Sequence, residues 1–260
     1  MKKGENKKAQ VTIFIIVAVI AVSLGILVYM YYPQIKATFG FEEKNPSAFI
    51  QDCLEREIKT TTEKLSLQGG SINPEHYFLY GGEKIKYLCY SESYYARCVV
   101  QEPMLIQSFE SEIKNEIEDE VEKCFDSMEE NYEKRGYGVD LKRGDFYVEL
   151  LPKKISVTFN STIVLSKDSS EKYDSFKIIL NNNLYELLSI ANNILEWEAR
   201  YGEAETTVYM DYYSNLKVEK KKQSDGTTIY ILTDSNTKDK FQFASRSIAW
   251  APGYGTGGVY

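Results

Sequence analysis

The sequence predicts an α+β fold, with an N-terminal transmembrane helix followed by an extracellular domain of about three helices packed with antiparallel strands and hairpins. Three observations predict it. One run, Val11–Tyr32, has no charged residue. Farther along, apolar residues recur at helical spacing, and elsewhere they alternate with polar residues as in half-buried strands. We expect a cytoplasmic basic tail (1–10), the apolar helix (11–32), a neck (33–44), an α+β region (45–250, with a subdivision near 140) and a flexible tail (251–260).

The apolar run is long enough to cross a membrane. At about 1.5 Å per residue it extends roughly 33 Å as a helix, and the hydrocarbon core of a bilayer is about 30 Å thick. Four lysines precede it, which favours an N-terminus on the inside and a C-terminal part on the outside. We therefore expect a single-pass protein of the cell membrane that contacts the lipid bilayer through Val11–Tyr32.

Two alternatives compete with this uncleaved anchor. A cleaved secretory signal usually has a shorter apolar core, of about 7–15 residues. The second alternative rests on Lys7-Lys8-Ala9-Gln10 before the apolar run. This segment resembles the processing site of archaeal class III signal peptides on type IV pilin-like proteins, and the resemblance implies cleavage between Ala9 and Gln10. Those proteins usually carry Glu where this chain has Phe14, which favours the uncleaved anchor.

The charge of the chain and its single histidine exclude several kinds of function. The formal net charge is −7, and an acidic surface repels nucleic acid. His76 is the only histidine, which argues against most metal sites and against Ser-His-Asp catalysis. No nucleotide-binding or hydrolase motif is present in the sequence. We expect no enzyme activity, no metal and no cofactor.

The four cysteines predict two disulfides on an external domain. Three pairings are possible. We prefer Cys89 with Cys98, because these residues bracket a predicted hairpin. We prefer Cys53 with Cys124, because both lie at the apolar faces of predicted helices and a bond would join the two. Free buried thiols are the alternative.

Apolar residues at spacings of three and four predict three helices. Gly69-Gly70 ends the first helix, since glycine accepts the left-handed cap conformation. The second carries an acidic face, Glu110–Glu133, which we expect to be solvated rather than to bind cations. The third follows a polar loop, Ser166–Asp174, and its apolar stripe begins at Leu180. The helices are expected over about 46–65, 105–128 and 180–197.

Alternating residues and turn signals predict the strands. We expect them at 77–80, 85–90, 98–100, 146–150, 155–165, 216–219 and 228–232, with a last strand from Phe241. Val208–Tyr213 is either extended or a helical turn. The sequon Asn160-Ser161-Thr162 is a candidate glycosylation site at Asn160. Tyr94-Tyr95 and the Gly/Tyr tail are either partner contacts or exposed coil.

Several short motifs occur in a defined order along the chain. They are KKAQVTIFIIVAVIAV at the start, Asp52-Cys53-Leu54, Leu67-Gln68-Gly69-Gly70, Cys124-Phe125, the strands around 148–159, the Leu-rich segment 184–194 and Phe241-Gln242-Phe243-Ala244. In this order they resemble a family of uncharacterised membrane-anchored surface proteins of small archaea with reduced genomes. The resemblance implies location and architecture but no chemistry, and its similarly placed cysteines support the pairing of Cys53 with Cys124.

The sequence therefore predicts a membrane-anchored cell-surface protein with a non-catalytic structural, adhesion or envelope role. Its expected partners are the bilayer, copies of itself or other envelope proteins, and not nucleic acid. A type IV pilin-like filament subunit processed before Gln10 is the alternative. An extracellular enzyme, for example one that hydrolyses a glycosidic bond with a pair of carboxylates, is a third and less favoured interpretation.

Overall fold

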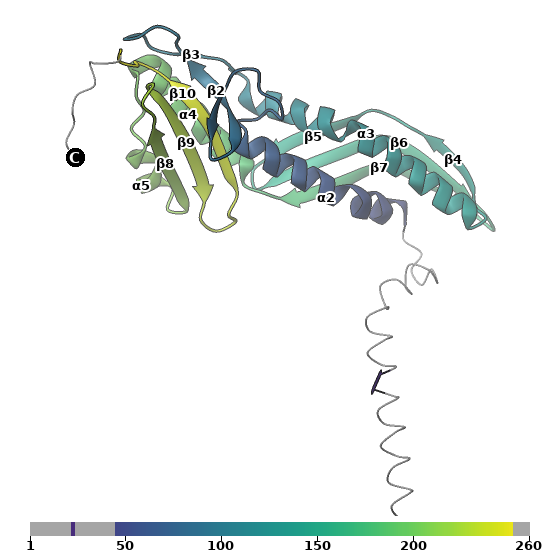
Figure 1. Cartoon of the computed structure of the whole chain (residues 1–260). Helices are drawn as coiled ribbons and strands as arrows, with labels where there is room; N and C mark the ends of the chain where they lie inside the picture. Colours follow the sequence, from purple (N-terminus) through teal and green to yellow (C-terminus); the bar gives the residue numbers. More distant parts are fainter. Residues whose placement is uncertain (1–21, 24–44, 252–260) are drawn as a thin grey trace, which may run out of the picture. The chain divides into compact units, whose positions relative to one another are not determined.

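The computed structural model describes residues 22–23 and 45–251. Contacts divide the chain after Asn45, and Pro46–Tyr260 forms one compact unit (Figure 1). Within the described ranges, no helix is long and apolar enough to span a bilayer. The expected transmembrane helix, apart from the helical residues Val22 and Ser23, lies outside these ranges, as do the basic tail, the neck and most of the C-terminal tail.

One sheet has six strands in the order β1-β2-β10-β9-β8, with β3 also paired to β2. They are β1 (Tyr77–Tyr80), β2 (Glu83–Tyr90), β3 (Val99–Val100), β8 (Leu216–Lys222), β9 (Thr227–Asp234) and β10 (Lys240–Arg246). The strand pairs of this sheet are antiparallel, as expected, except that β10 runs parallel to β2. These two strands come from distant parts of the chain, so no tight turn fixes their relative direction.

The second sheet has four antiparallel strands built around β6. They are β4 (Gly138–Lys142), β5 (Phe146–Leu151), β6 (Lys154–Ser166) and β7 (Ser170–Asn181). Along one edge β6 pairs with β5 and then with β4, and along the other edge it pairs with β7. One edge of β7 is therefore engaged with β6, and its other edge pairs with no strand of the described chain.

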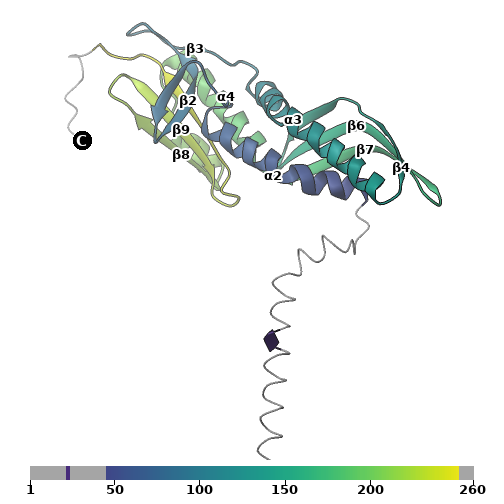
Figure 2. The same ribbon diagram turned by 45° about the vertical axis from the view of Figure 1, so that its right-hand side comes forward.

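The helices cover one side of each sheet. They are α2 (Pro46–Leu67), α3 (Leu105–Lys134), α4 (Leu184–Tyr201) and the short α5 (Thr207–Tyr212). Helices α2 and α3 lie side by side against the four-stranded sheet, and α4 packs on the six-stranded sheet (Figure 2). One continuous apolar core includes residues of all three long helices and of both sheets. The described part of the unit is therefore held together by a shared interior.

The third helix begins later than the sequence predicted. Leu180 lies in β7, and α4 starts at Leu184. Buried Phe176 and Ile178 alternate with exposed Lys177 and Ile179, a period of two that is typical of a strand. The polar residues just before them, expected as a loop, mostly belong to the β6–β7 hairpin. The spacing of Leu180 to Leu184 resembles a helix turn only by coincidence.

The first half of β6 carries two buried hydroxyl groups. The side chains of Ser156 and Thr158 are buried, and their oxygen atoms find no hydrogen-bond partner among the described residues. A buried hydroxyl without a partner loses its hydration and gains nothing in return. These two residues therefore stabilise the fold less than apolar residues of the same shape would.

Replacing Thr158 by valine is expected to stabilise the protein by about 1 kcal/mol, because valine keeps the shape, favours strands and removes the unpaired hydroxyl. Urea denaturation of the full-length chain in detergent measures the effect. Thr162→Val is the matched control, since the Thr162 hydroxyl donates to the Asp174 carboxylate at 3.0 Å. A Thr158→Val variant less stable than wild type would show that this hydroxyl is satisfied.

Candidate functional site

The structure places the four cysteines in two disulfides, and these are the pairs that the sequence analysis preferred. Cys89 at the end of β2 bonds to Cys98, with their Cα atoms 5.3 Å apart. Cys53 of α2 bonds to Cys124 of α3, with Cα atoms 6.1 Å apart. Both separations are usual for disulfides. The first bond closes the loop 90–97, and the second joins two helices that are already neighbours.

The loop closed by Cys89–Cys98 packs against two other segments at one end of the six-stranded sheet. The Tyr95 amide donates to the Ala249 carbonyl at 2.8 Å, and the Ile248 amide donates to the Ala96 carbonyl at 2.9 Å. From the other side, the Arg97 guanidinium donates to the Arg200 carbonyl at the end of α4, at 2.9 Å. Segments 91–97, 197–202 and 247–251 thus form one continuous structure.

Gly202 allows α4 to end against this structure. Its φ of 87° is the left-handed conformation that favours glycine, and its amide donates to the Glu198 carbonyl. A Cβ atom here would lie 2.0 Å from Cδ1 of Ile248. Because neither the backbone conformation nor the space accepts a side chain, the glycine fixes how closely the C-terminal segment approaches the helix.

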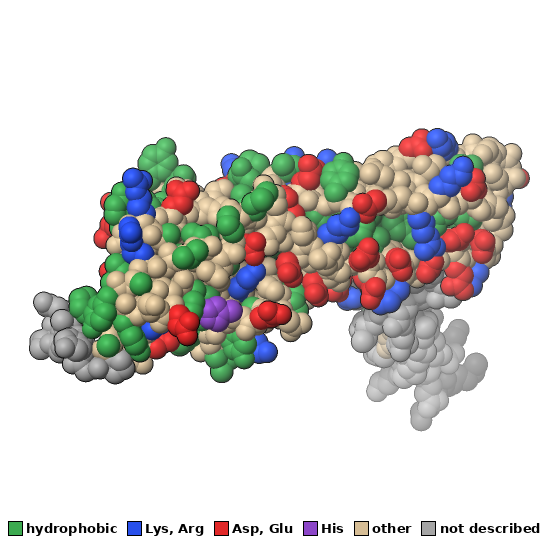
Figure 3. Space-filling view, turned by 90° about the horizontal axis from the view of Figure 1, so that it is seen from above, with side chains coloured by type: hydrophobic (Ala, Val, Ile, Leu, Met, Phe, Trp, Pro, Cys, Tyr) green, Lys and Arg blue, Asp and Glu red, His purple; other side chains and the backbone are tan. Residues whose placement is uncertain are grey.

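Five exposed aromatic side chains come from these three segments, and we call them together the aromatic end. Their exposed fractions are 44% for Tyr94, 52% for Tyr95, 61% for Trp250, 47% for Trp197 and 54% for Tyr201. The rings of Tyr95 and Trp250 meet edge to face at 5.4 Å, and those of Trp197 and Tyr201 lie 4.7 Å apart. Hydrophobic side chains are also more frequent toward the six-stranded sheet on the face in Figure 3, at its left.

Arg246 fixes the loop 90–97 through hydrogen bonds to its backbone. Its side chain is buried and donates to the backbone carbonyls of Ser91, Glu92 and Asp225. Its guanidinium also lies 5.2 Å from the ring centre of Tyr94, within range of a cation–π interaction. A single buried arginine therefore both orders the loop backbone and orients one of the exposed rings.

A buried carboxyl group anchors the aromatic end to the sheet. Glu198 of α4 is only 3% exposed. Its Oε1 accepts bonds from the Tyr230 hydroxyl at 2.5 Å and the Ala204 amide at 2.9 Å, and its Oε2 accepts from the Ser245 hydroxyl at 2.7 Å. The Ser247 hydroxyl donates to the Glu198 carbonyl at 3.0 Å. These bonds satisfy a buried polar group that would otherwise destabilise the fold.

Burial raises the pKa of Tyr230 far above its ordinary value, and the nearby carboxyl of Glu198 adds to this shift. The neutral phenol is therefore favoured in the folded protein. Its contribution to stability is fully present below the unfolded pKa of about 10 and is lost as the pH rises above that value.

We expect Tyr230→Phe to weaken the alkaline loss of stability by up to about 1.4 kcal/mol per pH unit above pH 10. The variant is less stable at neutral pH, because a hydrogen bond is missing, but its stability depends less on pH. Denaturation of the full-length chain from pH 8 to 11.5 gives both slopes. Tyr147→Phe, at an exposed tyrosine, should leave the wild-type slope unchanged; an equal slope in Tyr230→Phe would contradict the assignment.

The other residues singled out from the sequence lie apart from the aromatic end. Asn160 is exposed where the register of β6 with β7 shifts, between the parts of β6 that pair with β5 and with β4. The candidate processing site Ala9-Gln10 lies outside the described residues. His76 is exposed, and its ring packs against Tyr87 and Tyr90 at centroid distances of 4.6 and 4.1 Å. The structure thus places this histidine among aromatic rings.

The acidic face of α3 is largely solvated, but some of its carboxylates make contacts with other elements. Acidic side chains gather over the region of α3 in Figure 3, and Arg143 pairs with Asp126 and Glu129. Glu110 departs from the expectation of a purely solvated face, because it is partly buried and accepts a bond from the Leu150 amide at 2.7 Å. Among the described residues, no three His, Cys, Asp or Glu side chains are placed to hold a metal ion.

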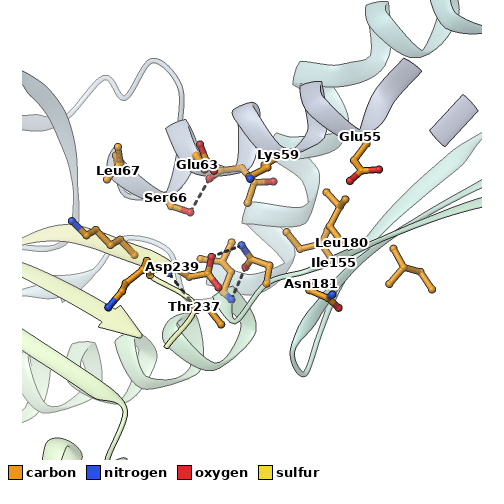
Figure 4. A pocket seen from close by; sticks show the side chains of 16 residues that line it. Glu55, Lys59, Glu63, Ser66, Leu67, Ile155, Leu180, Asn181, Thr237 and Asp239 are labelled. Carbon is orange, nitrogen blue, oxygen red and sulfur yellow. Dashed lines mark hydrogen bonds between the residues drawn. The ribbon is translucent and has the colours of Figure 1, made fainter. Parts of the chain in front are cut away.

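A pocket of about 600 Å³ lies between α2, the end of β7 and the β9–β10 turn (Figure 4). Its walls carry side chains of both charges, including Glu55, Lys59 and Asp239. Asp239 is already engaged, since its carboxylate accepts from the Asn183 amide at 2.7 Å and from the Asn182 side chain at 3.1 Å. The lining mixes acidic, basic and apolar side chains and does not indicate one class of ligand.

Only part of the aromatic end could be predicted from the sequence. Tyr94 and Tyr95 were candidates because tyrosine is suited to partner contacts, whereas Trp197, Tyr201 and Trp250 give no local signal and join them only through folding. The arrangement exposes large amphipathic rings, two of which lie beside arginines. No protein family model, curated protein or solved structure matches the chain.

Proposed function

We propose that the chain is a single-pass, membrane-anchored cell-surface protein whose N-terminus is cytoplasmic and whose unit from Pro46 onward is extracellular. The uncharged run Val11–Tyr32 and the lysines before it support this orientation. The two disulfides support it as well, since disulfides persist outside the reducing cytosol.

Its role in this proposal is non-catalytic: adhesion to another component of the cell envelope through the aromatic end. The observation that carries the proposal is the exposure of five aromatic side chains on a frame fixed by a disulfide, a buried arginine and a buried carboxyl group. Tyr, Trp and Arg are the residue types enriched where proteins bind one another. A preordered surface also loses little conformational entropy on binding.

Binding of proteoliposomes that carry the full-length chain to isolated cell envelopes tests the adhesive role. We expect Tyr95→Ala with Trp250→Ala to weaken binding at least about tenfold, which corresponds to about 1.4 kcal/mol, a usual effect of removing interface aromatics. Tyr147→Ala is the matched control, because Tyr147 is as exposed as Tyr94 and lies on the other sheet. Equal binding by the double variant and the control would contradict the adhesive role.

The intact mass of the membrane-bound protein separates the anchor from the filament alternative. A full-length mass supports the uncleaved anchor, whereas loss of residues 1–9 supports a pilin-like subunit processed before Gln10. Protease added to intact cells tests the orientation, since an extracellular unit is digested from outside and a cytoplasmic one is protected.

A further inference from the structure

The free edge of β7 presents a regular set of unpaired backbone groups. Just beyond the paired ends of β6 and β7, the Asn182 amide donates to the Lys153 carbonyl. This bond shows which residues of β7 direct their backbone groups toward β6. In an antiparallel pair, alternate residues direct both backbone groups to the partner strand and the others direct them away. The register therefore turns the N–H and C=O groups of Lys177, Ile179 and Asn181 away from β6. No hydrogen bond to these groups occurs among the described residues.

The other edges of the two sheets are protected. On β5, the outward Leu150 amide donates to the Glu110 carboxylate and the Phe146 amide to the Asp145 carboxylate. The edge strand β8 carries four lysines, and β1 and β4 have only four and five residues. Carboxylates, lysines and short length are the usual protections against pairing with another chain. The second half of β7 has none of these except Lys177.

The side chains of this segment favour pairing. The sequence Phe176-Lys177-Ile178-Ile179-Leu180-Asn181 has one charge, no proline and three consecutive β-branched or leucine residues, a composition with high strand propensity. Ile179 is 49% exposed on the outer face. On the inner face, Leu180 is half-buried and borders the pocket beneath α2, so an added strand would cover apolar surface on both sides.

We infer that β7 is a self-association edge, at which the β7 strand of a second copy of this chain pairs antiparallel across a two-fold axis at Ile179. This goes beyond the proposed adhesive role and uses a different surface. In this register Ile179 lies opposite Ile179 of the second copy, and Lys177 lies opposite Asn181. Lys177, Ile179 and Asn181 of one copy, whose backbone groups point away from β6, then lie opposite Asn181, Ile179 and Lys177 of the other. These three pairs give about six backbone hydrogen bonds.

A second copy fits this edge because the edge is complementary to itself. The pairing places no two like charges opposite each other, whereas like charges directly opposite would destabilise it. It sets Ile178 of the second copy next to Leu180, at the side of the pocket. The two-fold symmetry is that of most homodimers.

Single cysteines test the register in the full-length chain in detergent, where the native cysteines are already bonded. Opposite residues of such a pair have Cα atoms about 5.5 Å apart, a separation that a disulfide can bridge. Ile179→Cys is expected to give a covalent dimer on mild oxidation. Asn181→Cys alone should give far less, and a mixture of Asn181→Cys with Lys177→Cys should give it again. Equal cross-linking at 179 and 181 alone would overturn the register.

A charge exchange tests the association itself by sedimentation. Ile179→Lys and Ile179→Glu each place like charges opposite each other, and each is expected to weaken dimerisation at least about tenfold. A mixture of the two variants is expected to restore it as a heterodimer. Leu79→Lys, at an exposed residue of the edge strand β1, is the control and should dimerise as wild type does. A monomeric wild type, or variants at Ile179 that dimerise unchanged, would overturn the inference.

Discussion

Removal of the Cys53–Cys124 disulfide by Cys53→Ala with Cys124→Ala is expected to lower the free energy of unfolding by about 4 kcal/mol. The bond joins residues 71 positions apart, and closing so long a loop strongly restricts the unfolded chain. Alanine is chosen rather than serine because Cys124 is buried, and serine would place an unpaired hydroxyl there. Since a domain is typically stable by only about 5–15 kcal/mol, this is a large fraction of the total.

The Cys89–Cys98 disulfide provides the matched comparison. It closes a loop with a separation of only 9 residues, so Cys89→Ala with Cys98→Ala is expected to cost about 2.5 kcal/mol. Urea denaturation of the full-length chain in detergent gives both values, and the proposed adhesion should decline only in the second variant. A smaller loss for the Cys53–Cys124 variant than for the Cys89–Cys98 variant would contradict the loop-length argument.

Glu198→Ala is expected to destabilise the protein by about 4 kcal/mol. The substitution leaves the Tyr230 and Ser245 hydroxyls and the Ala204 amide without their acceptor, and each buried polar group without a partner costs about 1–3 kcal/mol. It also leaves a cavity between α4 and the sheet. The loss should appear in thermal and urea denaturation alike.

Two further variants separate the hydrogen bonds of Glu198 from its position on the helix. Glu198→Gln keeps an acceptor for Tyr230 and is expected to cost only about 1 kcal/mol. Glu196→Ala, at an exposed position of the same helix, should change stability by less than about 0.5 kcal/mol. If Glu198→Ala were as mild as Glu196→Ala, the buried network would contribute nothing to stability.

Much of the fold could be predicted because most of its elements show a clear period. The stripe from Leu105 to Met128 predicted α3, although the helix continues to Lys134, and the strands expected at 216–219 and 228–232 form the β8–β9 hairpin. The strand β7 was missed because its first half is polar and its last apolar residue, Leu180, stands four positions before Leu184. The exposed strand β4 gave almost no signal, since few of its side chains enter the core.

The candidate site was less predictable for a different reason. A local pattern reports which face of an element is buried, but not which segments meet. Trp197 and Trp250 lie more than fifty positions apart and reach the same end only because Gly202 lets Ile248 approach α4. The β2–β10 pairing is equally non-local. The cysteines were an exception, since their positions on predicted elements restricted the choice of partners.

In the proposed membrane-anchored protein, the disulfide between α2 and α3 would also determine how mechanical load is carried. Tension on the proposed anchor would enter at Pro46, where α2 begins, and Cys53 follows after only two turns of that helix. A pull along the tether can unravel those first turns, but beyond them the force passes through a covalent bond into α3. Shear at the cell surface would therefore meet a cross-link before it could peel α2 from the core, and a chain with this cross-link reduced would yield at a much smaller force.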